Sequence, residues 1–460
     1  MLAVQRNAQV AIALSLCLLV FLAWMFIGHP IVGLALCMAP LLFIGTLQVP
    51  FLMVLMFIIF SFFRIHEAFP QLYPLRIPLM LAAASLTVLV WHVVITQKIQ
   101  PYWRPEMTWL ATFFGLVTLG LPLAVNMPEA ITAYTGAYIK IGIMTLAVAW
   151  MTREAKDFSL ASKMIVIAGI SIALVALYNK ANGIGLVEGT RVTIGRDIRS
   201  SIGDPNDLAL VLMFPMAFAA SLLMTPKVGV ISKTIGTLGA PLLFAAVIAT
   251  QSRGGLLGIM AVFGVFGYKR IKSKVLLFAI GGLAMLMLIA MAGISGRESG
   301  GAAEEGVDAS AMGRLYAWQA AWSMALTHPV SGVGLNNFYA NYFFHSPHWD
   351  GKNHSVHSTW FGVLAETGFL GLFVFVALIR ALLKSSLRSI SRIENSGAAP
   401  PGVHAAAQAV FAGLVATLVS GTFLTQGFNW PIYILTALVI ALSQWVESNI
   451  PDKSTGESKL

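Results

Sequence analysis

Residues 313–338 read GRLYAWQAAWSMALTHPVSGVGLNNF, residues 339–358 read YANYFFHSPHWDGKNHSVHS, and residues 359–372 read TWFGVLAETGFLGL. Five of the nine histidines of the chain fall in this stretch. The last of them, His357, stands where the polar segment meets an apolar run. We therefore interpret the rest of the chain as a membrane frame that positions this stretch.

The composition indicates an integral membrane protein. Hydrophobic residues make up 58% of the chain and charged residues only 10%, whereas about a quarter of the residues of a soluble domain are charged. Because about 20 apolar residues suffice to cross a bilayer, the sequence predicts an all-α polytopic membrane protein with about 12, and up to about 14, transmembrane helices and a long, partly helical outer loop. The longer apolar runs lie near residues 10–28, 78–96, 107–125, 134–152, 160–178, 206–224, 275–294, 356–383, 404–424 and 428–446, and the shorter ones near 31–46, 49–63, 233–250 and 255–268.

Lys and Arg collect in alternate short loops, and the positive-inside rule assigns these loops to the cytoplasm together with both termini. Five segments follow from this pattern: N-terminal transmembrane helices (1–180), an arginine-rich loop (181–205, the arginine loop), central helices with an SRGG turn (206–294), a long outer loop (295–355), and C-terminal helices with a cytoplasmic tail (356–460). The arginine loop, the SRGG turn and the long loop are all predicted on the face opposite the cytoplasm.

The net charge of +10 does not indicate nucleic-acid binding, because the cations are spread over short loops and form no basic domain. Orientation in the membrane and recognition of a phosphorylated lipid explain it better. Cys17 and Cys37 both lie inside apolar runs, which predicts packing residues and excludes a disulfide framework.

The turn Gln251-Ser252-Arg253-Gly254-Gly255 has the features of an anion site. Ser252 is suited to cap a helix, and the helix that follows offers backbone N–H groups and the positive end of its dipole. With the guanidinium of Arg253 added, a phosphate or diphosphate could bind there. The alternative is a solvated turn whose arginine reaches lipid headgroups.

The arginine loop carries Arg191, Arg196 and Arg199. Three cations on an outer loop run against the positive-inside bias, which favours an anionic ligand. Arg199, the nearest to the next helix, is slightly favoured over the other two. The DPND sequence that follows predicts a helix start, with Asp204 as the cap and Pro205 at the first helical position.

Two readings of the histidines are open. His345, His348, His354 and His357 could be imagined to supply a metal site, which needs three or four ligands. A single histidine that acts as a general base is simpler. We expect a helix from near residue 355, which would bring His354 and His357 toward one face.

Residues 314–326 predict a helix that lies on the membrane surface, with Trp318 and Trp322 at the level of the headgroups. The outer loops contain no DxD-type acidic pair. A sugar nucleotide held through a divalent cation is therefore not supported, whereas a donor already activated on a lipid diphosphate would need only cations and a base.

QSRGGLLG, then GRLYAW with HPVSGVGLNNF, then a histidine at a helix start with AETGFLGL downstream resembles the O-antigen ligase and polymerase superfamily of bacterial envelope glycosyltransferases, and most closely an O-antigen ligase. The resemblance implies a multi-pass protein of the bacterial inner membrane that acts in lipopolysaccharide biosynthesis. Its members transfer a glycan from undecaprenyl diphosphate to an acceptor on the periplasmic face. An O-antigen ligase uses a lipid A-core hydroxyl as that acceptor, so these lipids and no cofactor or metal are expected.

The resemblance also implies roles for residues. His357 would remove the acceptor proton, while Arg253 and one of the three loop arginines would hold the diphosphate. Arg314 and His354 are candidate supporting residues. Direct displacement of the diphosphate predicts inversion at the anomeric carbon. An O-antigen polymerase and a protein O-oligosaccharyltransferase of the same superfamily remain alternatives, and a transporter of lipid-linked sugars is a weaker one.

Overall fold

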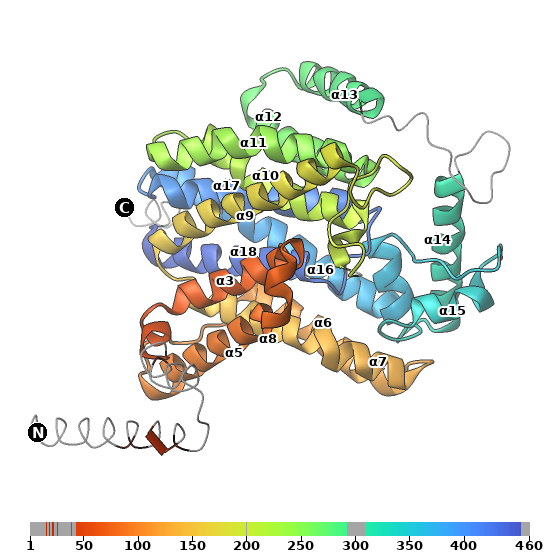
Figure 1. Ribbon diagram of the computed structural model, residues 1–460, viewed down its shortest axis with the longest axis horizontal. Helices are drawn as coiled ribbons and strands as arrows, with labels where there is room; N and C mark the ends of the chain where they lie inside the picture. Colours follow the sequence, from red (N-terminus) through yellow and green to blue (C-terminus); the bar gives the residue numbers. More distant parts are fainter. Residues whose placement is uncertain are drawn as a thin grey trace, which may run out of the picture.

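The computed structural model describes residues 43–198, 200–291 and 309–451, with a few single positions before residue 39. Its regular elements are helices, and the described residues contain no strand apart from an isolated bridge between Val187 and Arg191. In chain order (Figure 1) they are α3 (Pro50–Phe62), α4 (Ile65–Ala68), η1 (Pro70–Leu75), α5 (Ile77–Val90), η2 (Trp91–Ile95), α6 (Pro105–Gly120), η3 (Leu121–Leu123), α7 (Met127–Ala133), η4 (Tyr134–Tyr138), α8 (Ile139–Met151), α9 (Ala155–Asn182), η5 (Ser201–Gly203), α10 (Pro205–Met224), α11 (Val230–Thr250), α12 (Arg253–Arg270), α13 (Lys274–Met291), α14 (Ala309–Thr327), α15 (Phe338–His345), α16 (Thr359–Ser396), α17 (Pro401–Gly421) and α18 (Trp430–Asn449). The all-α prediction is confirmed for these ranges.

Nine helical segments within the described ranges are long and apolar enough to cross a membrane. They are Gln71–Ile95, Pro105–Leu123, Met127–Met151, Ala155–Asn182, Pro205–Met224, Val230–Thr250, Thr359–Ser396, Pro401–Gly421 and Trp430–Asn449. The predicted number of 12 to 14 crossings is not confirmed. One reason is that α3 has only 13 residues, about 20 Å of helix against a hydrocarbon core of about 30 Å. Another is that the predicted runs 10–28 and 31–46 lie largely outside the described residues.

Helix α10 lies at the centre of the bundle, where it packs against α9, α11, α12 and α17. Glycines on the neighbouring helices allow this close packing. A Cβ at Gly169 of α9 would lie 2.4 Å from Cγ of Pro215, and one at Gly255 of α12 would lie 2.5 Å from Cβ of Ala209. Small residues at such contacts let helix backbones approach in a membrane. The contact at Gly255 also brings the first turns of α10 and α12 together.

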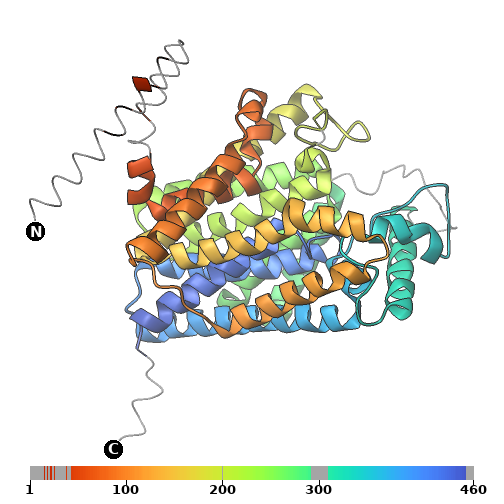
Figure 2. The same ribbon diagram turned by 90° about the horizontal axis from the view of Figure 1, so that it is seen from below.

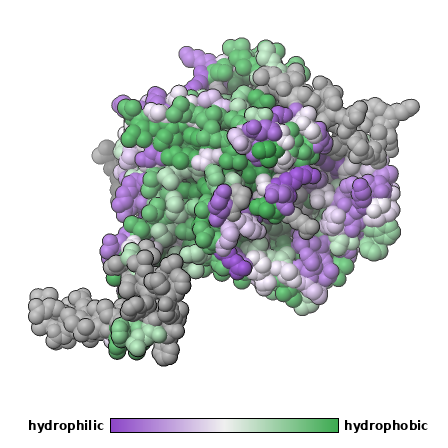
Figure 3. Space-filling model, viewed as in Figure 1, coloured by the Kyte–Doolittle hydropathy of each residue, from purple (hydrophilic) through white to green (hydrophobic). Residues whose placement is uncertain are grey.

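Helices α14 and α15 cross one end of the bundle, next to the start of α16, and the arginine loop lies at this same end (Figures 1 and 2). Apolar side chains cover much of the face over α9 and α11, while polar side chains gather toward this end (Figure 3). The predicted polar loops are therefore grouped, as the alternation of apolar runs requires.

Helix α16 is interrupted at Gly368, whose backbone angles are φ 68° and ψ −172°. Non-glycine residues rarely adopt this conformation. The amide of Phe369 bonds to the carbonyl of Pro329 at 2.8 Å, so the HPVSGVGLNNF segment packs into the interruption. The Glu366 carboxylate accepts hydrogen bonds from the amides of Asn336 (2.9 Å) and Phe338 (3.4 Å). The Glu366 carboxylate therefore holds the turn that leads into α15.

Candidate active site

The arginine loop is bound to the SRGG turn through Asn206 at the start of α10. Its side-chain oxygen accepts hydrogen bonds from Nη2 of Arg191 and from Oγ of Ser252, each at 2.9 Å. The backbone supports this contact, since the amide of Val192 donates to the carbonyl of Ala249 at 3.2 Å. The arginine loop, the start of α10 and the distant SRGG turn thus form one unit.

The predicted arginines have different environments. Arg191 is buried, with 7% of its surface exposed, and its Nε donates to the carbonyl of Thr250 at 3.3 Å. Its guanidinium therefore holds the turn between α11 and α12. Arg196 is exposed, so it is accessible to a ligand. Arg199 lies outside the described residues.

Both predicted helix caps are present. Ser252 Oγ accepts a hydrogen bond from the amide of Gly255 at 3.2 Å, and Asp204 accepts from the amides of Asn206 (2.7 Å) and Asp207 (3.4 Å). Arg253 is the first residue of α12 and is half-buried. The positive end of the α12 dipole and the Arg253 side chain therefore both lie at the first turn of α12.

His357 is exposed and stands outside α16. Its φ of +44° lies in the left-handed region, and Ser358 caps the helix by accepting a hydrogen bond from the amide of Phe361 at 3.5 Å. The expected helix start near residue 355 is wrong, because the left-handed residue separates His357 from the helix. His354 does not share a helical face with it; its Nε2 contacts the Asp350 carboxylate at 3.0 Å.

The segment around His357 is held on both sides. Before it, Nε1 of Trp318 donates to the carbonyl of Val356 at 3.1 Å. After it, the Thr359 hydroxyl donates to the carbonyl of Leu424 at 2.7 Å and accepts from the amide of Gln426 at 3.0 Å. The position of the imidazole is therefore set by α14 and by the loop between α17 and α18.

The predicted helix over residues 314–326 is present within α14, but its tryptophans contact protein. Trp318 stacks on Phe361, with ring centroids 5.1 Å apart and planes at 12°, and Trp322 meets Phe369 edge to face at 5.5 Å. Trp322 remains 49% exposed. The aromatic face thus anchors α14 to α16. The sequence did not predict these contacts, because they depend on the position of α14 across the start of α16.

Charged groups from two other elements act on His357. Burial is the largest cause that lowers the pKa of its imidazole, the Arg314 guanidinium and His354 lower it further, and the Asp204 carboxylate opposes them. We therefore treat the ring, Arg314 and Asp204 as one candidate site. Near neutral pH the ring is uncharged and able to accept a proton.

Phe423 joins the Arg314 side of this candidate site to α12. The Arg314 guanidinium lies 5.9 Å from the centroid of the Phe423 ring, within the range of a cation–π contact. A Cβ at Gly254 would lie 3.6 Å from Cβ of Phe423. His357, Arg314, Asp204 and the start of α12 therefore surround one region at this end of the bundle.

The other histidines of the long loop have separate partners. His345 contacts the Ser323 hydroxyl at 3.0 Å, and His348 stacks on Tyr316 with centroids 4.8 Å apart. In the part of the chain that the structure describes, no three His, Cys, Asp or Glu side chains are grouped as metal ligands.

The roles of Asn206 and Phe423 were not predicted from the sequence. Asn206 had a signal, because it lies inside the DPND helix start, where a side chain that is not needed as a cap is free to bond elsewhere. Phe423 had none, since the packing of α17 against α12 and the contact with Arg314 of α14 bring it to the candidate site only in the folded protein.

No curated protein matches the chain. Residues 238–376 match the family model described as O-antigen ligase. The matched segment runs from α11 into α16 and includes Arg253, Arg314 and His357. The match supports a relationship of this segment to the O-antigen ligase superfamily, a group of enzymes of the glycosyltransferase type.

Proposed function

We propose that the protein transfers a glycan, the O-antigen, from undecaprenyl diphosphate to a hydroxyl of lipid A-core at the periplasmic face of the bacterial inner membrane. The observation that carries the proposal is the position of His357. Its exposed imidazole stands at the mouth of α16, where Asp204 and Arg314 both act on it. Asn206, two residues after Asp204, is bonded to Arg191 and to Ser252, the residue before Arg253. The family match supports the same type of reaction.

In this mechanism His357 is the general base. The lowered pKa keeps the imidazole neutral near pH 7, so a ring nitrogen takes the proton of the acceptor hydroxyl as its oxygen attacks the anomeric carbon. The new bond joins that carbon to the acceptor oxygen, and the bond to the diphosphate oxygen breaks. Undecaprenyl diphosphate leaves with the electron pair, and direct displacement inverts the anomeric carbon.

The diphosphate is bound at the start of α12. Arg253 supplies a guanidinium, the helix supplies the positive end of its dipole, and the exposed Arg196 supplies a second cation across the turn. Arg199 is proposed as a further ligand of the diphosphate. Arg191 acts indirectly, because its buried guanidinium positions the turn. These groups stabilise the charge that develops on the leaving group.

Arg314 and His354 support the base. Arg314, a residue of α14, lowers the pKa of His357. His354 pairs with Asp350 at 3.0 Å, which anchors the chain three residues before the base. Neither residue needs to touch the reacting atoms in this mechanism.

The test is glycan transfer by the purified protein in liposomes that contain undecaprenyl-diphosphate-linked O-antigen and lipid A-core. The His357→Ala variant is expected to lower the rate by about 100-fold or more. His404→Ala is the matched control, since His404 lies near the start of α17 and contacts Gln408 at 2.8 Å. Unchanged transfer by His357→Ala, in a protein with the wild-type melting temperature, would refute the proposed base.

The products of the same assay separate the alternatives. Longer lipid-linked chains without a lipid A-core conjugate would identify a polymerase. Transfer to an added protein acceptor alone would identify an oligosaccharyltransferase. Movement of the donor across the bilayer with no covalent product would identify a transporter. Transfer is expected to persist in EDTA, and its loss would indicate a metal-dependent mechanism.

A further inference from the structure

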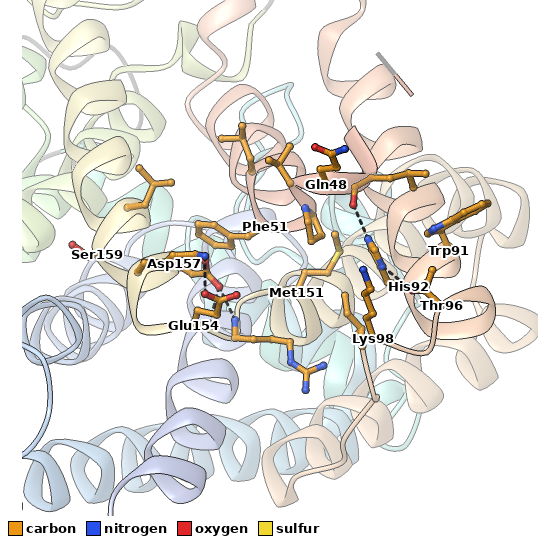
Figure 4. A pocket seen from close by; sticks show the side chains of 18 of the residues that line it. Gln48, Phe51, Trp91, His92, Thr96, Lys98, Met151, Glu154, Asp157 and Ser159 are labelled. Atoms are coloured by element: carbon orange, nitrogen blue, oxygen red, sulfur yellow. Dashed lines mark hydrogen bonds and ion pairs between the residues drawn. The ribbon is translucent and has the colours of Figure 1, made fainter. Parts of the chain in front are cut away.

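A large cavity lies at the end of the bundle away from His357. It has a volume of about 1130 Å³ and is formed by α3, the end of α5 with η2, and the turn between α8 and α9 (Figure 4). The first residues of α9 line it, whereas Asn179 near the end of α9 donates to the carbonyl of Thr193 in the arginine loop at 3.0 Å. The length of α9 therefore separates this cavity from the candidate site at His357.

Four cations line this cavity, which we call the lysine cavity: Lys98, Arg153, Lys156 and Lys163. Its two carboxylates are already engaged. Asp157 accepts from the amides of Arg153 (3.0 Å) and Glu154 (2.8 Å), and Glu154 pairs with Lys156 at 2.7 Å.

The side chains of Lys98, Arg153 and Lys163 have no carboxylate partner within the described part of the chain. The segment that leads into α3 does not change this balance, because the first acidic residue of the whole sequence is Glu67. The cavity therefore has an excess of positive charge.

Lys163 distinguishes this cavity from an ordinary cytoplasmic loop. The positive-inside bias accounts for cations in short loops, as at Lys98 and Arg153. Lys163 instead lies eight residues into α9, about 12 Å along the helix from Ala155. It is half-buried and lies within a candidate membrane span. An ionisable side chain in such a position marks a binding site when no acid neutralises it.

Most of the rest of the wall is apolar. Phe51, Trp91, Met151 and Leu160 are among the lining residues, and Figure 4 shows Lys98 between Met151 and His92. His92 fixes one side of the wall, because its ring bonds to the carbonyl of Leu47 at 2.8 Å and to the Thr96 hydroxyl at 2.9 Å. An occupant must therefore combine an anionic group with an apolar body.

We propose that the lysine cavity binds a membrane lipid with a phosphate headgroup. Lys98 and Arg153 contact the phosphate from the loops, and Lys163 contacts it from α9. The lipid chains lie against the apolar wall. This site is distinct from the proposed glycan-transfer site, and its test does not use glycan transfer as the readout.

The first arm of the test is native mass spectrometry of the purified full chain with phosphatidylglycerol or phosphatidylcholine of the same chains. Retention of phosphatidylglycerol is expected to exceed that of phosphatidylcholine by roughly tenfold, because charge-assisted contacts are the stronger ones. Equal retention of the two lipids by the wild-type protein would overturn the proposal without any variant.

The second arm uses substitutions. Lys163→Gln is expected to lower phosphatidylglycerol retention by roughly fivefold, and the Lys98→Gln/Lys163→Gln pair to lower it further. Lys233→Gln is the control, because it removes an exposed cation from the first turn of α11. Equal losses in Lys163→Gln and Lys233→Gln would show a general surface effect and overturn the site.

The third arm separates a lipid from a free anion. Glycerol 3-phosphate is expected to leave phosphatidylglycerol bound, since it lacks the chains that the wall contacts. Displacement of the lipid at equal concentration would identify a plain phosphate site and overturn the lipid assignment. A diazirine-bearing phosphatidylglycerol is expected to label peptides that contain residues 44–52, 91–99 or 151–163, and labelling confined to other peptides would contradict the location.

Discussion

The indole Nε1 of Trp318 donates a hydrogen bond of 3.1 Å to the carbonyl of Val356, the residue directly before His357. A side chain of α14 therefore positions the proposed base through its backbone. Trp318→Phe removes this bond and keeps an aromatic ring to stack on Phe361. We expect a roughly tenfold fall in kcat with little change in the KM for the donor, because the base is misplaced and the diphosphate site is untouched.

The control for this prediction is Trp322→Phe. Trp322 contacts α16 at Phe369 and bonds to no part of the His357 segment. Equal losses of kcat in the two variants would mean that Trp318 acts only through the packing of α14.

The pH dependence of transfer follows from the pKa of His357. Since burial and Arg314 lower this pKa below its usual 6.5, the base stays neutral under mildly acidic conditions, and the rate falls only below the ordinary range of histidine. Arg314→Gln removes one lowering cause, so its pKa rises and the acid limb of kcat moves to higher pH. The measurement is kcat in the liposome assay between pH 4.5 and 8 (about two units on either side of 6.5). If the acid limb of Arg314→Gln stays where it is in the wild-type protein, the assignment of His357 as the base is contradicted.

Asn206 is expected to be essential for the stability of the site. Asn206→Ala leaves the buried Arg191 and the Ser252 hydroxyl without their shared acceptor, which costs about 1 to 3 kcal/mol and lowers the melting temperature by several degrees. Asn206→Asp keeps an acceptor oxygen and is expected to lose less. Asn182→Ala serves as the control, because the Asn182 amide bonds only to the carbonyl of Tyr178 in its own helix.

Gly169 tests the packing of α9 on α10. A Cβ there would lie 2.4 Å from Cγ of Pro215, and the rigid ring cannot move aside, so Gly169→Ala is expected to destabilise the protein by about 1 to 3 kcal/mol. Gly264→Ala is the matched helical control, because nothing lies within 4 Å of its added Cβ. If both variants melt at the same temperature, the close contact at Gly169 is not a determinant of stability.

Local sequence signals were sufficient for much of the fold. Apolar runs located the candidate spans, since helix length and hydropathy are properties of a single segment. The caps Ser252 and Asp204 were equally local, because each bonds to amides two or three residues ahead. The grouping of the polar loops at one end followed from the alternation of crossings.

Features that depend on tertiary contacts could not be predicted from the sequence. The start of α16 was misplaced because nothing in the local sequence requires His357 to adopt φ +44°; the bonds of Val356 and Thr359 to distant elements hold it there. Arg191 was grouped with Arg196 because both are loop arginines, yet only the contact with Asn206 and Thr250 buries one of them.

The length of α9 sets a thickness that the surrounding bilayer must match. Its 28 residues extend about 42 Å, close to the 40–45 Å of a bilayer that includes its headgroups. Lys156 near its first turn and Lys180 near its last place a cation at each end. In a thinner bilayer the helix would have to tilt, and because α9 connects the lysine cavity to the arginine loop, the tilt would displace both ends together.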